Sequence, residues 1–203
     1  KRCIDSILKS KFDERYELIV IDDASGDDTS KIAEKSGVKI ITNKECRGPG
    51  FSRNRGAKFA QGDILVFVDS DVLLFEDTLQ RIDDFFFDEK DFVAISCNFD
   101  PECEMTDAIS RYKHLHICYS FRNQPQAVLW TFTSTLAVKK NAFAAAGGFN
   151  EQVFFQEDEL FGRELSKKGF KIAFAEQMRV KHLHKYSCFD FLKEEIKRSQ
   201  VLI

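Results

Sequence analysis

Hydrophobic and polar positions in the first half of the chain alternate between short apolar runs and amphipathic stretches. Apolar runs rich in branched aliphatic residues predict strands that are covered on both faces, and the stretches between them predict helices. We expect strands at 17–22, 38–42, 63–69 and 92–98, and helices at 27–36, 51–61 and 76–87. This order predicts an α/β domain with a mainly parallel, Rossmann-like sheet flanked by helices.

The second half of the sequence follows the same rhythm less regularly. Its pattern predicts helices at 105–121, 139–146 and 156–168, extended segments at 131–138 and 170–175, and an amphipathic tail from residue 189. No repeat and no linker-like stretch interrupts the chain. We therefore expect a single domain over residues 1–203.

Composition excludes several classes of protein. Thirty basic residues against 33 acidic ones give a net charge of −3, which argues against a nucleic-acid-binding protein. No apolar run approaches the roughly 20 residues that cross a bilayer, and no signal peptide is visible. Phenylalanine dominates the aromatic residues, with 21 Phe against 4 Tyr and 1 Trp, so we expect a core rich in Phe.

The six cysteines are scattered and form no Cys-x-x-Cys pair. A chain of this length can bury an adequate core without disulfides, so free thiols are the better interpretation. Reduced thiols favour a cytoplasmic location. Peripheral association with the inner face of a membrane stays open.

Three acidic clusters stand where predicted strands end or a helix begins. Asp22-Asp23 and Asp69-Ser70-Asp71 end strands, and Glu157-Asp158 opens a helix. Ligands bind outside the carboxyl ends of strands in open α/β sheets, so we expect the first two clusters to line one crevice. An Asp-x-Asp pair there suits a hard divalent ion that also holds phosphates, but a capped helix or solvated turn would use the same residues.

Five motifs then give the sequence a family resemblance. They are the runs 17–29 and 47–57, the run 60–71 that ends in Asp69-Ser70-Asp71, the run 147–163, and Val180-Lys181-His182. In this order they resemble the motifs of family 2 glycosyltransferases of GT-A fold, over nearly the whole chain. The resemblance implies a GT-A-like catalytic domain with a nucleotide-binding half (1–100) and an acceptor-binding half (101–203).

The resemblance also implies an activity. A sugar would pass with inversion from a UDP- or GDP-linked donor to a hydroxyl of a glycan or lipid-linked acceptor, as in cell-surface polysaccharide synthesis. The reaction would depend on Mn²⁺ or Mg²⁺. Two alternatives remain: a nucleotidyltransferase of similar fold, and a non-catalytic module that binds a sugar or a partner.

Carried over by position, the resemblance assigns the donor site. Asp23 is similar to the acid that binds the nucleotide base, Asp22 and Ser25 shape the turn beside it, and Arg53 is similar to a basic residue near the nucleotide. Asp69 would face the ribose or sugar and contribute to the metal site. The metal ligands would be Asp69, Asp71 and His182, whereas for His184 a phosphate contact and a solvated surface position are equally open.

The catalytic base is expected in Glu157-Asp158, because an inverting transfer needs a carboxylate that takes the proton of the acceptor hydroxyl. The spacing from Asp158 to Arg163 is one residue shorter than the family pattern. An ungapped match would therefore make Glu157 the base. Neighbours on a helix point about 100° apart, so only one of them can act, and we favour Asp158.

The remaining positions concern the acceptor and a second histidine pair. Trp130 falls where the family has acceptor-side residues, although a half-buried core position explains it equally well. Gly148 fits a tight turn that positions the acceptor loop.

His114 and His116, near Cys118, match no common zinc spacing, so structural roles are the better interpretation.

The start of the sequence departs from the family pattern. Family members usually begin with a strand that binds the nucleotide, and Lys1–Leu8 resembles the helix after it. We therefore expect an open sheet edge beside the nucleotide site and weaker nucleotide binding.

Overall fold

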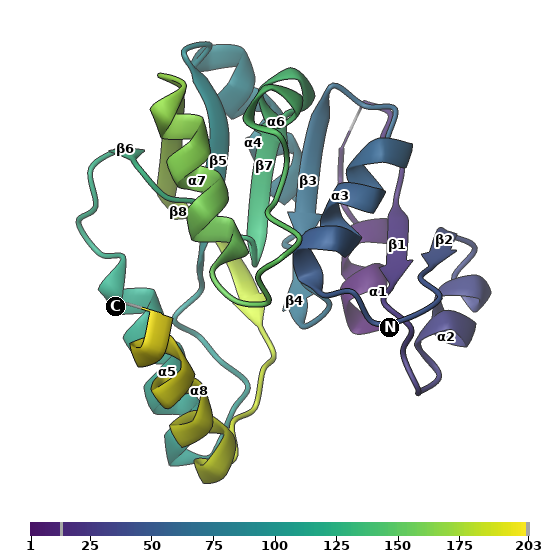
Figure 1. The fold of residues 1–203 in the computed structure, drawn as a ribbon, viewed down its shortest axis with the longest axis vertical. Helices are drawn as coiled ribbons and strands as arrows, with labels where there is room; N and C mark the ends of the chain where they lie inside the picture. Colours follow the sequence, from purple (N-terminus) through teal and green to yellow (C-terminus); the bar gives the residue numbers. More distant parts are fainter. Residues whose placement is uncertain (13, 202–203) are drawn as a thin grey trace.

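Two β-sheets and the helices around them make up the fold, which a computed structural model describes for residues 1–12 and 14–201 (Figure 1). The helices are α1 (Arg2–Leu8), α2 (Thr29–Lys35), α3 (Pro49–Phe59), α4 (Thr78–Asp88), α5 (Ala108–Ser120), α6 (Lys140–Ala146), α7 (Glu157–Lys167) and α8 (Cys188–Val201). The strands are β1 (Ile19–Asp22), β2 (Lys39–Thr42), β3 (Ile64–Val68), β4 (Val72–Leu73), β5 (Phe92–Phe99), β6 (Ala127–Val128), β7 (Thr135–Lys139) and β8 (Lys171–His182). Every helix and strand expected from the pattern is present, with shifted ends; β4 and β6 were not expected.

The larger sheet has the order β3-β7-β5-β8-β4, with β6 added beside β8. Strands β3, β5 and β8 run in one direction, whereas β7 lies antiparallel between β3 and β5. The α/β class with flanking helices is confirmed, but the sheet is mixed rather than mainly parallel. A parallel neighbour needs a crossover back to the other end of the sheet. The chain leaves the carboxyl end of β5 through α5, pairs with the start of β8 as β6, and then comes back to the carboxyl ends before β7 begins, so β7 runs in the opposite direction (Figure 1).

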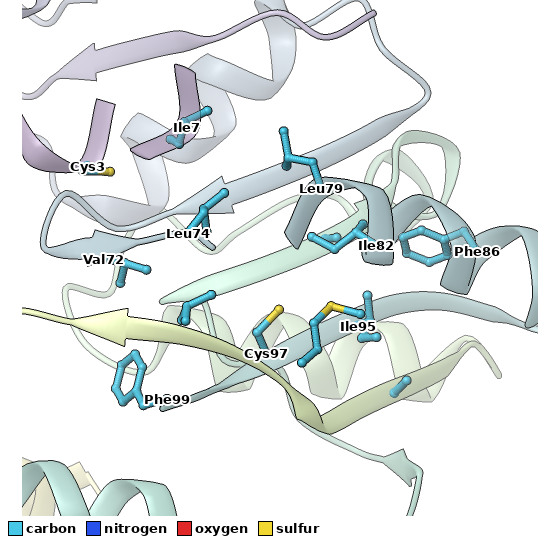
Figure 2. Close-up of a cluster of buried hydrophobic side chains, with 14 of the residues drawn as sticks. Cys3, Ile7, Val72, Leu74, Leu79, Ile82, Phe86, Ile95, Cys97 and Phe99 are labelled. Atoms are coloured by element: carbon cyan, nitrogen blue, oxygen red, sulfur yellow. The ribbon is translucent and has the colours of Figure 1, made fainter. Parts of the chain in front are cut away.

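The core lies on both sides of this sheet. One cluster gathers α1, α4 and the strands around β5, and Figure 2 shows Ile82, Phe86, Ile95 and Phe99 within it. The other is rich in Phe and packs α6 and α7 onto β7, with Phe161 only 1% exposed. The Phe-rich core is thus confirmed, although a few Phe side chains remain exposed.

Two further expectations concern cysteines and membranes. All six cysteines are free thiols, as expected. Among the described residues, no helix has the length and apolar character needed to cross a bilayer.

The smaller sheet consists of β1 and β2, which pair in parallel. Among the described residues, neither β1 nor β3 pairs with a strand on its other edge. A cavity of about 640 Å³ separates them, and its walls include Ile4 and Ile7 of α1, Val20 of β1 and Val66 of β3. Two open strand edges therefore face an apolar gap beside α3.

This gap predicts uneven protection of the backbone. Unpaired amides of β1 and β3 that face the gap should exchange hydrogen faster than the amides of β5 and β8, which have strands on both sides. Hydrogen–deuterium exchange followed by mass spectrometry or NMR measures this directly. Equal protection of β1, β3 and β5 would mean that the gap is closed in solution.

Candidate functional site

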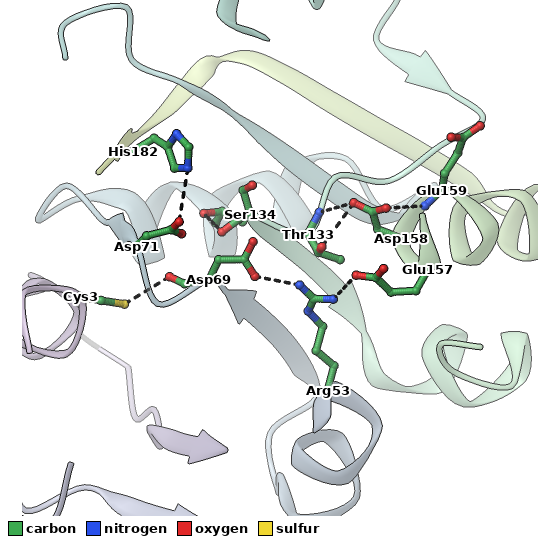
Figure 3. Close-up of polar contacts among 11 residues, drawn as sticks. Cys3, Arg53, Asp69, Asp71, Thr133, Ser134, Glu157, Asp158, Glu159 and His182 are labelled. Carbon is green, nitrogen blue, oxygen red and sulfur yellow. Dashed lines mark hydrogen bonds and ion pairs between the residues drawn. The ribbon is translucent and has the colours of Figure 1, made fainter. Parts of the chain in front are cut away.

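A buried arginine joins two acidic clusters that the sequence separates widely. Arg53 projects from α3, and its guanidinium donates to Asp69 Oδ1 at 2.8 Å and to Glu157 Oε1 at 2.5 Å (Figure 3). The side chains of Arg53 and Glu157 are 15% and 8% exposed. The bridge therefore connects α3, the end of β3 and the start of α7.

The turn after β3 separates the two aspartates of the Asp-x-Asp motif. The Val72 amide donates to the Asp69 carbonyl at 3.1 Å, which closes a tight turn. Asp69 then faces Arg53, whereas Asp71 faces His182 (Figure 3). The sequence predicted Asp69, Asp71 and His182 as ligands of one metal ion. The structure brings Asp71 and His182 together, whereas Asp69 is bound to Arg53.

Asp71, His182 and His184 form a compact group whose ligand atoms all lie within 4.8 Å of one another. Asp71 Oδ2 is 3.6 Å from His182 Nε2 and 3.0 Å from His184 Nδ1. One carboxylate oxygen and two imidazole nitrogens at this spacing can hold a divalent cation. Among the described residues, this is the group of three with that property.

The charges of the site are unbalanced. Burial raises the pKa of Glu157 and of Asp69, and Arg53 only partly offsets this because two carboxylates share it. Burial also acts on Asp71, but contacts with His182 and His184 outweigh it and hold the pKa of Asp71 well below its usual range. Asp158 adds a fourth carboxylate beside Glu157. The excess of negative charge is what a bound cation would neutralise.

Asp158 is held by the chain segment that leads into β7. The Thr133 amide and hydroxyl each lie 3.3 Å from Asp158 Oδ2, and the Thr131 hydroxyl donates to the Asp158 carbonyl at 2.6 Å. A Cβ at Gly162 would lie 2.5 Å from the Thr131 amide nitrogen, so only glycine permits this close approach of α7. Thr131 and Thr133 follow Trp130 in the segment that the sequence associates with the acceptor, but their contacts with Asp158 were not predicted, and Gly162 was not singled out.

The residues predicted to bind the nucleotide are held by hydrogen bonds to nearby turns and loops. Asp22 accepts from the Ser25 amide at 3.1 Å and from the Ser30 hydroxyl at 2.5 Å. Asp23 accepts from Asn43 Nδ2 at 2.6 Å and from the Gly48 amide at 2.7 Å. These contacts tie the end of β1 to the loop before α3.

The two residues predicted to lie near the acceptor, Gly148 and Trp130, contact α3 and β8 respectively. Gly148 has φ +74°, and a Cβ there would be 2.6 Å from Asn54 Oδ1, which accepts from the Phe149 amide at 2.8 Å. Trp130 is half-buried, with its ring 4.8 Å from Phe121 and 5.2 Å from Phe174 between centroids. These contacts are those of a core aromatic residue.

The second histidine pair does not form a site. His114 is buried and its Nε2 lies 2.7 Å from the Asp100 carbonyl, whereas exposed His116 stacks on Tyr112. Residues two apart on a helix point in nearly opposite directions, which explains the divergence.

Comparisons with known proteins give this geometry a family context. The family model described as "Glycosyl transferase family 2" matches residues 1–148. The O-antigen chain rhamnosyltransferase WbaN of Salmonella anatum is 26% identical over 84% of this chain and 58% of its own length. A glucosyl-dolichyl phosphate glucuronosyltransferase of Haloferax volcanii is 24% identical over 93% of this chain and 66% of its own length. The chain thus spans about three fifths of these curated relatives.

Solved structures share the fold. The mannosyltransferase PcManGT of Pyrobaculum calidifontis, solved with GDP-Man and Mn²⁺, superposes with a TM-score of 0.77 at 20% identity, over 98% of this chain and 56% of that one. TarS 1-349 of S. aureus with UDP-GlcNAc gives 0.68 at 22% identity, over 91% of this chain and 54% of that one. The GT-A fold expected from the sequence is confirmed.

The bridge predicts that loss of Arg53 destabilises the fold far more than loss of the surface residue Arg163. Arg53→Ala would leave Glu157 buried without a cation and should lower the free energy of unfolding by about 3 kcal/mol near pH 8. The loss should shrink at pH 5, because an unpaired buried carboxylate with a raised pKa takes up a proton as the pH falls. Urea unfolding at both pH values measures it.

Arg163→Ala is the matched control. Arg163 pairs with Glu159 at 2.6 Å on the surface of α7, where both side chains are exposed. Its removal should change the free energy of unfolding by no more than about 0.5 kcal/mol. Equal losses for the two variants would contradict a structural role of the Arg53 bridge.

Proposed function

Because the chain belongs to glycosyl transferase family 2, we propose that it transfers a sugar from a nucleoside diphosphate donor to an acceptor hydroxyl, with inversion and with a divalent cation. The observation that carries the proposal is the meeting of the acidic turn after β3 with the start of α7, across Arg53 (Figure 3). This arrangement offers a group that can hold a cation and a carboxylate without an ion pair at the same end of the larger sheet.

Asp158 is the proposed catalytic base, in preference to Glu157. Glu157 is buried and bound to Arg53. Asp158 has no ion pair with any described residue, and its carboxylate contacts only Thr133 and its own helix start. A carboxylate fixed in this way can accept the proton of an acceptor hydroxyl as that oxygen attacks the anomeric carbon opposite the leaving diphosphate. With Asp158 as the base, the residue that this sequence lacks relative to the family pattern falls between Asp158 and Arg163.

A divalent cation fits the group that includes Asp71 and His182. Asp71 and His182 would hold it, and the surplus of carboxylates over cations favours its binding. When bound, it would act as a Lewis acid that neutralises the departing diphosphate. Mn²⁺ is the first ion to test, since the related PcManGT structure contains it.

The donor contacts are proposed from the positions of the family motifs in this sequence. In the 1–100 half, Asp23 would contact the nucleotide base, with Asp22 and Ser25 holding the turn. Arg53 and Asp69 would lie on the ribose and diphosphate side. UDP- and GDP-linked sugars are the first donors to test, since related structures contain UDP-GlcNAc and GDP-Man.

The acceptor would approach the 101–203 half. Gly148 would hold the loop beside it, and Trp130 is the weaker acceptor contact because its ring packs on Phe121 and Phe174. The relatives named for O-antigen and dolichyl phosphate substrates make a glycan or lipid-linked acceptor the first class to test. Such an acceptor is compatible with action in the cytoplasm at the inner face of a membrane.

Donor binding provides the direct test. We expect one of UDP, GDP, CDP and dTDP to raise the melting temperature when Mn²⁺ is present and to raise it less when EDTA is present. A ligand at a hundredfold excess over its Kd adds about 2.7 kcal/mol to stability, which a thermal-shift assay detects. Release of that nucleoside diphosphate from the matching sugar donor completes the test, whereas release of pyrophosphate from a nucleoside triphosphate would point to nucleotidyl transfer.

Three isosteric variants test the base. Asp158→Asn should lower the rate of transfer by about 10²–10⁴-fold, because the amide cannot accept the proton. Glu159→Gln, one residue further along α7, should retain the rate. The rates come from nucleoside diphosphate release with saturating donor. A fully active Asp158→Asn beside an inactive but folded Glu157→Gln would move the base to Glu157.

A further inference from the structure

We propose that His184 is a direct ligand of the divalent cation, so that two imidazoles and one carboxylate make the site selective for a first-row transition metal ion over Mg²⁺. The inference rests on the sugar transfer proposed above and deepens its metal requirement. It adds a ligand that the resemblance of the sequence to its family does not supply.

The distances favour His184 at least as much as His182. Asp71 Oδ2 lies 3.0 Å from His184 Nδ1 and 3.6 Å from His182 Nε2. A metal ion bonds to carboxylate oxygen and imidazole nitrogen at about 2.0–2.2 Å, so ligand atoms around one ion lie roughly 3–4 Å apart. Both distances from Asp71 Oδ2 fall in this range, and all three ligand atoms lie within 4.8 Å of one another.

The backbone fixes the order of these ligands. Val72 of β4 is paired with His182 of β8, and the Leu183 amide donates to the Asp71 carbonyl at 2.8 Å. Side chains two residues apart on an extended chain point to the same side. The pairing thus presents His182 and His184 together to the carboxylate of Asp71.

Ring stacking orients the imidazoles. The His182 ring lies 4.3 Å from the Phe99 ring at an angle of 4°, and the His184 ring is 5.8 Å from His182 at 8°. Tyr186 closes the row, 4.4 Å from His184. A ligating histidine usually donates its second ring nitrogen to a fixed acceptor, but His182 Nδ1 is buried without a partner in the structure. The stack provides the orientation that such a bond would give.

The donor set determines which ions bind well. Mg²⁺ prefers oxygen ligands in a near-octahedral arrangement, whereas imidazole nitrogen favours first-row transition metal ions. Asp69, the other oxygen donor of the motif, is bound to Arg53 at 2.8 Å. A site with two nitrogens and one protein carboxylate therefore disfavours Mg²⁺, while Mn²⁺ and Co²⁺ accept both kinds of ligand.

Metal binding can be measured without following transfer. The wild-type chain and its His184→Ala variant are titrated with Mn²⁺ by electron paramagnetic resonance, alone and with UDP or GDP, and a large excess of Mg²⁺ then competes. His116→Ala is the control, because His116 is an exposed imidazole stacked on Tyr112. We expect the Kd for Mn²⁺ to rise about tenfold or more in His184→Ala, with a smaller preference over Mg²⁺, and to stay unchanged in His116→Ala.

Proton NMR of the Co²⁺-loaded chain counts the bound rings. Directly bonded imidazoles show contact-shifted ring protons, and the chain has only 4 histidines. We expect two shifted rings in the wild type and one in His184→Ala. Two rings in the variant, one in the wild type, or equal binding of Mg²⁺ and Mn²⁺ would overturn the proposal.

The two proposals fail in different ways. A wild-type chain that binds no Mn²⁺ overturns the His184 site, and nucleoside diphosphate release in EDTA would then leave sugar transfer standing. Mn²⁺ binding that depends on His184, without release from any sugar donor, would support the metal site and contradict the proposed transfer.

Discussion

The shared guanidinium of Arg53 is the interaction on which the geometry of the site depends. It is the cation between Asp69 after β3 and Glu157 at the start of α7, and it comes from a third element, α3. Two carboxylates approach one another in a buried place only when a cation or a shared proton lies between them. Because Arg53 satisfies both, α7 can begin beside the acidic turn. That leaves the next residue, Asp158, as a carboxylate without an ion pair among the described residues.

The same bridge gives the two aspartates of the Asp-x-Asp motif different surroundings. Asp69 binds Arg53 and so connects the turn to α3. Asp71 instead faces two histidines. The tight turn at Asp69 and the pairing of β4 with β8 produce this division, since they reverse the chain between two residues that an extended strand would point the same way. Charge and backbone geometry thus give two aspartates only two positions apart different environments.

Sequence patterns predicted most of the fold because its strands are apolar runs bounded by turns and its helices are amphipathic. They did not predict the reversed β7, since hydrophobic alternation carries no information on strand direction. They also ended the last strand near residue 175, whereas β8 continues to His182 past an irregularity in its pairing with β5. The motifs led to Arg53, Asp71, Asp158 and His182. The His-x-His pattern also drew attention to His184, but no local pattern predicted its contact with Asp71 or the contact of Thr133 with Asp158, because both depend on pairings across the chain.

The reversed direction of β7 explains why Asp158 lies near the acidic turn after β3. A strand parallel to β3 would begin at the opposite end of the sheet. Since β7 is antiparallel, the segment before it lies at the carboxyl ends of β3 and β5, where the Asp69 amide donates to the Ser134 carbonyl at 3.1 Å. From there Thr133 reaches Asp158, and Gly162 lets α7 approach the backbone at Thr131. The one strand whose direction the sequence pattern could not predict is therefore the one that joins the two halves of the site.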